Sequence, residues 1–94
     1  MDISDSAHIM CIDLALRDVR RETSRQVAKW GIQDHSQDKW LVILMEEVGE
    51  AARAICDKDD DNYEVELIQT AAVAVSALVN FKNQRAKRAY EASI

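Results

Sequence analysis

No proline occurs in this chain of 94 residues, and glycine occurs only at positions 31 and 49. Proline and glycine are the residues that most often end a helix, whereas Ala, Leu, Glu, Arg and Gln, which favour helices, are abundant here. The sequence therefore predicts an all-α fold. A chain this short buries only about 60% of its unfolded surface and cannot divide that into two cores. We expect one domain over residues 1–94.

Two stretches rich in turn formers divide the chain, GIQDHSQD at 31–38 and DKDDDN at 57–62. Gly31 is placed to end a first helix, and Asp61 followed by Glu64 resembles a capping box that begins the third. We expect the first helix to end at Trp30. The second should run from about Asp38 to Cys56, and the third from near Asn62 to about Tyr90. This pattern predicts a compact bundle of three main helices, with room for a short fourth.

The third helix is apolar nearly all round. Between Val65 and Val79 the residues that are not apolar are Glu66, Gln69, Thr70 and Ser76. Such a helix must be covered from several sides, and two companions from one chain hardly suffice. We therefore expect a homodimer or homotetramer that completes the core. The segment AAVAVSA at 71–77 can also be read as a strand, but its length, its alanines and its lack of turn signals favour a helix.

The charge balance argues against several classes of partner. Seventeen acidic and twelve basic residues give a net charge of −5, which is unlike a nucleic-acid-binding surface. Charged residues make up 31% of the chain and no uninterrupted apolar run approaches ~18 residues, so we expect no membrane span. Cys11 and Cys56 lack metal-binding spacing, and the N-terminus does not resemble a signal peptide. These features favour the cytoplasm.

Three carboxylates share one side of the second helix. At ~100° per residue, Glu46, Glu47 and Glu50 fall within one arc of about 100°. Ile43 and Ala54 lie in the same arc, which indicates that the acids are partly buried. Like charges one turn apart repel, and desolvation strengthens the repulsion. A positive charge is expected among them.

Glu66 also needs a positive charge nearby, because it lies in the most apolar helix. Burial of an unpaired carboxylate there costs several kcal/mol. One explanation is an ion pair, with Arg53 near Glu46 as the nearest partner; the other is a divalent cation held by oxygen ligands. An iron-carboxylate bundle needs histidines on the helices, and His8 and His35 lie elsewhere. Oxygen ligands favour Mg²⁺, or Mn²⁺, over zinc or iron.

These residues resemble the signature of the MazG-type all-α nucleoside triphosphate pyrophosphohydrolases, which is E-x-x-E, a spacer and E-x-x-D. EVGE, with Glu47 and Glu50, is followed after fifteen residues by ELIQ, which runs from Glu66 to Gln69. The segment KWGIQDHSQDKWLVILMEEVGE is similar to the usual approach to this signature. The resemblance covers about residues 21–77.

The resemblance implies an enzyme that hydrolyses a (deoxy)nucleoside triphosphate to the monophosphate and pyrophosphate, clearing non-standard or excess nucleotides. Glu47, Glu50 and Glu66 would hold Mg²⁺, which would neutralise the charge that builds on the phosphoryl oxygens, and Glu47 is therefore counted with the catalytic residues. Gln69 replaces the last acid of the signature; its carbonyl can ligate Mg²⁺ but brings no charge. The alternative from another class is a non-catalytic helical dimerisation or regulatory module that kept the fold and lost this acid.

Five further residues are assigned to the reaction. Glu46 is a candidate for polarising the attacking water or for holding a further metal ion, and the alternative is an exposed acid paired with Arg53. Lys39 and Arg53 lie near the Glu46 sector and are candidates for gripping the triphosphate, or else are surface charges. Trp30 and His35 precede the second helix, where the resemblance places nucleobase contacts, although Trp30 also fits a core stripe.

Overall fold

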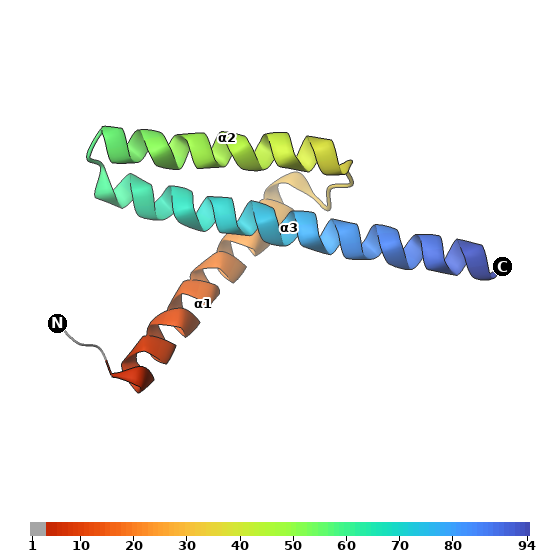
Figure 1. The fold of residues 1–94 in the computed structure, drawn as a ribbon, viewed down its shortest axis with the longest axis horizontal. Coiled ribbons are helices and arrows are strands. Elements are labelled where there is room, and N and C mark those ends of the chain that lie inside the picture. The colour runs from red at the N-terminus through yellow and green to blue at the C-terminus, as the bar shows by residue number, and fades with distance from the viewer. Residues whose placement is uncertain (1–3) are drawn as a thin grey trace.

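The computed structural model describes residues 4–94, which form the three helices α1 (Asp5–Trp30), α2 (Gln37–Cys56) and α3 (Asp60–Ser93). The described part of the chain contains no strand and no fourth helix, so the all-α prediction is confirmed and the strand reading of 71–77 is wrong. α2 and α3 lie side by side and antiparallel, and α1 crosses α3 at an angle (Figure 1). Within residues 4–94, α1 packs against α3 and not against α2.

Local hydrogen bonds and backbone conformation set the end of α1 and the start of α2. Gly31, at φ 78°, ends α1, and its N–H donates to the carbonyl of Val27 at 2.8 Å. Only glycine adopts this left-handed conformation without strain. Ser36 begins α2, because its hydroxyl oxygen accepts from the backbone N–H of Lys39 at 3.2 Å. The turn between these two residues borders the cavity described below.

α3 begins earlier than the sequence predicts. The carboxylate of Asp59 accepts from the N–H of Asn62 at 3.1 Å, so Asp59 and not Asp61 caps the helix. Lys58, at φ 54°, turns the chain in the left-handed region just before this cap. The turn is therefore shorter than composition suggests, and Asp61 lies inside the first helical turn.

The single chain is elongated, so the predicted compactness is wrong for one copy. Its extents are 58 × 33 × 21 Å and its radius of gyration is 16.5 Å, against about 12 Å for a compact chain of this length. The first half of α1 and the last turns of α3 project away from the body (Figure 1). The accessible surface is 7588 Å², about 2,000 Å² more than a compact chain of this mass exposes.

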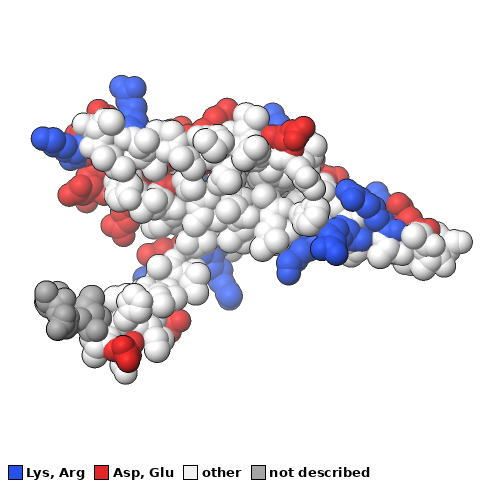
Figure 2. Space-filling view, in the orientation of Figure 1, with Lys and Arg blue, Asp and Glu red and all other residues white. Residues whose placement is uncertain are grey.

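The core of one copy is small. Buried apolar side chains are Trp40, Ala51, Ala54, Ala72 and Val73. The alanines leave room for α2 and α3 to pack closely, with Trp40 at one end of their contact. Large apolar residues of α3 stay exposed, including Leu78 at 54% and Val79 at 51%. The face of α2 and α3 seen in Figure 2 is almost free of charged residues, which gather at its two ends.

By length and mean hydropathy, α3 also passes the test for a helix that can cross a membrane. Only 22% of the tested stretch is buried within one copy. The same helix carries two buried polar side chains, Glu66 and Asn80. A carboxylate at the centre of a bilayer is costly, so these residues fit a helix covered by protein better than one covered by lipid.

Candidate metal centre

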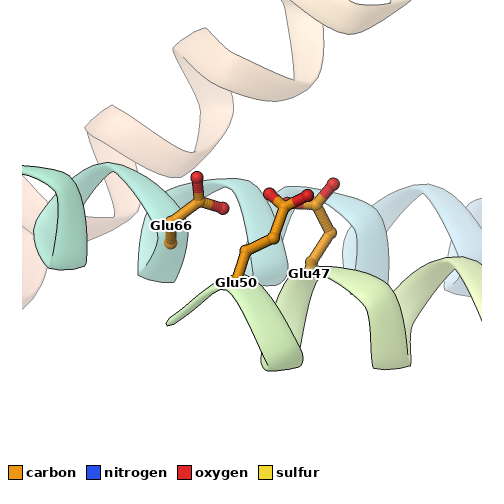
Figure 3. Close-up of side chains that lie close together, drawn as sticks. All are labelled: Glu47, Glu50 and Glu66. Carbon is orange, nitrogen blue, oxygen red and sulfur yellow. The ribbon is translucent and has the colours of Figure 1, made fainter. Parts of the chain in front are cut away.

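Three carboxylates meet between α2 and α3. Glu47 and Glu50 lie one turn apart on α2, and Glu66 faces them from α3 (Figure 3). One carboxylate oxygen from each residue lies within 4.8 Å of the other two. The predicted convergence of acids from two helices is therefore present.

The cluster includes oxygens that have neither solvent nor a hydrogen-bond partner. Glu66 is only 8% exposed, Glu47 is half-buried and Glu50 is exposed. The Oε2 atoms of Glu47 and Glu66 are buried and accept no hydrogen bond. Burial of an unpaired carboxylate oxygen is costly, so something must offset it.

Burial and mutual repulsion raise the pKa values of two acids in the cluster. Burial, together with the neighbouring Glu50 and Glu47, raises the pKa of Glu66 from 4.5 to about 7. Burial and repulsion by Glu50 likewise raise the pKa of Glu47. Both shifts mean that these carboxyl groups favour the protonated form unless a cation lies among their oxygens.

No side-chain cation of residues 4–94 supplies that charge. The ion pairs among these residues are Arg17–Asp18, Arg25–Glu22 and Arg53–Asp57. None of the three reaches the cluster, so the ion-pair explanation finds no support in the described residues. A ligand set made only of oxygens fits a hard divalent cation such as Mg²⁺ or Mn²⁺.

Gln69 lies one helical turn after Glu66 and is half-buried. It lines a cavity of about 400 Å³ together with Glu47. Gln69 therefore stands at the border between the cluster and the space open to a ligand.

Glu46 does not join the cluster. Its side chain is exposed, because it lies about 100° around α2 from Glu47. It still contributes to the raised pKa of Glu47 through its charge. The structure thus shows no contact that would give Glu46 a role in polarising water.

The two basic residues proposed to grip phosphates also lie apart from the cavity. The Arg53 side chain is 82% exposed and pairs with Asp57 at 3.6 Å, not with Glu46. Lys39 is exposed on the first turn of α2, and neither residue lines the cavity.

Residues of α1 form the opposite wall of the cavity. Trp30 lines it with 63% of its surface exposed, and the ammonium of Lys29 lies 4.8 Å from the centre of its ring. Arg25 lines the same cavity. Arg25 and Lys29 were not predicted as site residues. The crossing of α1 over α3 brings both of them to the cavity.

His35 does not line the cavity, but it contacts residues that do. Its ring packs edge to face on Trp40, with centroids 5.1 Å apart, and its Nε2 lies 3.1 Å from the side-chain oxygen of Gln33. Its backbone N–H donates to the side-chain oxygen of Asn80 at 2.9 Å. This arrangement fixes the turn between α1 and α2. Asn80 was not singled out in the sequence, although its amide interrupts an apolar helix.

Comparison with models of protein families, with curated proteins and with solved structures finds no match to this chain. Function is therefore inferred from the residues and their geometry.

Proposed function

We propose that this protein is a Mg²⁺-dependent hydrolase that cleaves (deoxy)nucleoside triphosphates to the monophosphate and pyrophosphate. The observation that carries the proposal is the convergence of Glu47, Glu50 and Glu66 within 4.8 Å, with buried, unpartnered oxygens on two of them. The spacing of these acids, E-x-x-E and then a third acid with Gln69 one turn later, is the sequence pattern that resembles the MazG-type enzymes.

The three acids would hold Mg²⁺, with Mn²⁺ as a substitute, and Gln69 is placed to add a neutral oxygen. A bound Mg²⁺ supplies the positive charge that offsets the charge building on phosphoryl oxygens. Glu47 has one side in the cluster and also borders the cavity, so it marks the point where the phosphates would meet the acids. Glu46 is exposed and is not assigned a role.

The cavity suits a nucleotide. Its volume of about 400 Å³ lies in the range of small-molecule sites. The exposed ring of Trp30 offers a face on which a base can stack, and the amide side chains of Gln33 and Asn83 offer hydrogen bonds to its edge. His35 would act by holding the turn rather than by touching the base.

The enzyme would work as a homodimer or homotetramer in the cytoplasm. One copy exposes about 2,000 Å² more than a compact chain, which is the area that a stable interface removes from each partner in an obligate assembly. The nearly uncharged face of α2 and α3 in Figure 2 fits a second copy of this chain. Cys11 and Cys56 are free and exposed, which suits a reducing compartment.

The test is Mg²⁺-dependent release of pyrophosphate from a panel of deoxynucleoside triphosphates by the purified protein. Glu66→Gln should lower kcat/KM by about 10² or more, the loss typical of removing one electrostatic stabiliser. Glu64→Gln is the matched control, because Glu64 is exposed near the start of the same helix. Release of orthophosphate instead of pyrophosphate would contradict the proposal that the bond between the α and β phosphates is cleaved. A folded oligomer without turnover or any response to Mg²⁺ would instead support the regulatory-module alternative.

A further inference from the structure

Glu22 and Arg25 lie one turn apart on α1 and form an ion pair. Arg25 binds Glu22 through two parallel hydrogen bonds, Nε to Oε1 at 2.8 Å and Nη2 to Oε2 at 2.7 Å. The Glu22 carboxylate also accepts from Gln26 at 3.0 Å. The Glu22 side chain is only 13% exposed, whereas that of Arg25 is 54% exposed. The Glu22 carboxylate is therefore mostly covered by protein, while the Arg25 side chain that binds it is open to solvent.

Arg25 reaches the site from two sides. It lines the 400 Å³ cavity together with Glu47 and Gln69, and it lines a neighbouring cavity of about 290 Å³ that Gln69 also borders. Arg25 and Glu47 thus border the same cavity, which is the space where the phosphates of a nucleotide would lie.

Building on the proposed function, we propose that Arg25 grips the phosphates of the nucleotide, and that Glu22 holds it ready until a nucleotide arrives. A guanidinium that binds a carboxylate through two parallel bonds can bind two phosphate oxygens with the same geometry. Arg25 would therefore be paired with Glu22 before the nucleotide binds and with phosphate oxygens afterwards. Glu22 retains its hydrogen bond from Gln26, and Lys29 offers a second positive charge on the same wall.

The arrangement of the other basic side chains supports this assignment. Arg53 and Lys39 do not line the cavity. Neither do the basic residues near the C-terminal end of α3, which are Lys82, Arg85, Lys87 and Arg88. Arg25 and Lys29 are the basic residues that line the cavity within the described part of the chain. A triphosphate that binds beside three carboxylates needs positive charges nearby, because the two sets of negative charges repel each other.

The experiment measures the affinity for imidodiphosphate, a pyrophosphate analogue that is not hydrolysed, by calorimetry in excess Mg²⁺. This probe does not depend on the base. Arg25→Gln should weaken binding about 10-fold to 100-fold, as expected for the loss of a charge-assisted, two-point contact. Arg20→Gln is the control, because Arg20 is exposed on the same helix and lines neither cavity. Its affinity should equal that of the unmodified protein.

Glu22→Gln distinguishes two explanations of the pair: that Arg25 binds phosphate, or that the pair only stabilises the position of α1. If Arg25 grips phosphate, this variant frees the guanidinium and binds the analogue as tightly or several-fold more tightly. If the pair only holds α1 in place, Glu22→Gln and Arg25→Gln break the same contact and weaken binding alike. That second result, or binding by Arg25→Gln within twofold of the unmodified protein, would overturn the proposal.

Thermal stabilisation by Mg²⁺ without any analogue tells the two proposals apart. Arg25→Gln should keep this stabilisation, whereas Glu66→Gln should lose most of it. Normal binding by Arg25→Gln together with loss of Mg²⁺ stabilisation by Glu66→Gln would reject the role of Arg25 and leave the proposed function standing. An unmodified protein that neither binds the analogue nor responds to Mg²⁺ would reject both.

Discussion

The side-chain oxygen of Asn80, on α3, accepts a 2.8 Å hydrogen bond from the indole N–H of Trp40, on α2. The Asn80 amide donates in turn to the carboxylate of Asp34 at 3.0 Å, and Gln84 donates to the same carboxylate at 3.0 Å from the next turn of α3. These bonds lower the pKa of Asp34. One buried amide therefore ties the start of α2 and the preceding turn to α3, and with them the cavity wall.

Asn80→Ala should destabilise the fold by about 1–3 kcal/mol, because it leaves the buried indole N–H of Trp40 without an acceptor. For a domain of this size, each kcal/mol lowers Tm by about 4–8 °C. Asn83→Ala is the control, since Asn83 is exposed one turn along. Urea unfolding at fixed protein concentration measures both. A change of less than about 0.5 kcal/mol for Asn80→Ala would show that the network contributes little.

The stability of the metal-free protein should fall as the pH rises from about 5 to 8, relative to that of Glu66→Gln. The pKa of Glu66 is about 7 in the folded chain, against an ordinary value of 4.5, so the folded state binds the proton more tightly than the unfolded chain does. The stability from the protonated carboxyl is fully present below about pH 4.5 and is lost as the pH rises through 7. The raised pKa of Glu47 acts in the same direction.

Thermal unfolding of both proteins at about pH 5 and pH 8 in a chelator measures this difference. The comparison with Glu66→Gln removes the opposite contributions of Glu22 and Asp34, whose pKa values are lowered and whose stabilisation is lost at acid pH. Millimolar Mg²⁺ should restore the stability at the higher pH and have less effect at the lower one, where protons compete for the ligands. Parallel pH profiles for the two proteins would mean that Glu66 does not titrate in this range.

Gln69→Asp tests whether residue 69 belongs to the ligand set. If it does, the new carboxylate should preserve or tighten Mg²⁺ binding and leave kcat/KM within about tenfold. If Gln69 serves only the core, the buried charge should cost several kcal/mol. Gln69→Asn is the control, because it changes length without adding charge. Melting temperatures with and without Mg²⁺ decide the matter: a destabilised Gln69→Asp that Mg²⁺ does not rescue places Gln69 outside the metal shell.

Light scattering should give a mass at least twice the 10.6 kDa of one chain. Leu78→Glu places a charge on the exposed apolar side of α3 and should weaken assembly, because an unpaired charge in an interface core is costly. Lys87→Glu, at an exposed position in the last two turns of α3, is the matched control and should leave the mass unchanged. A helical, cooperatively unfolding monomer of 10.6 kDa would reject the proposed assembly.

The helices and the acids were predictable because their signals are local. The absence of proline predicts long helices, and Gly31 ends α1 where expected because a left-handed residue stops a helix whatever packs on it. The rule that carboxylates on apolar helix faces need a positive charge predicted that acids of two helices meet, and the resemblance to the MazG-type signature selected Glu47, Glu50 and Glu66. The capping box at Asp61 failed because two neighbouring acids, Asp59 and Asp60, offer similar signals.

The roles of the surrounding residues depend on how the helices cross. Helical periodicity says which side of α2 holds Glu46, but the position of α3 decides that Glu47 meets Glu66 and that Glu46 stays exposed. In the same way, the crossing of α1 over α3 brings Arg25 to the cavity, whereas Arg53 lies near the end of α2 and pairs with Asp57. Crossing angles come from packing between residues far apart in the chain, and no local pattern encodes them.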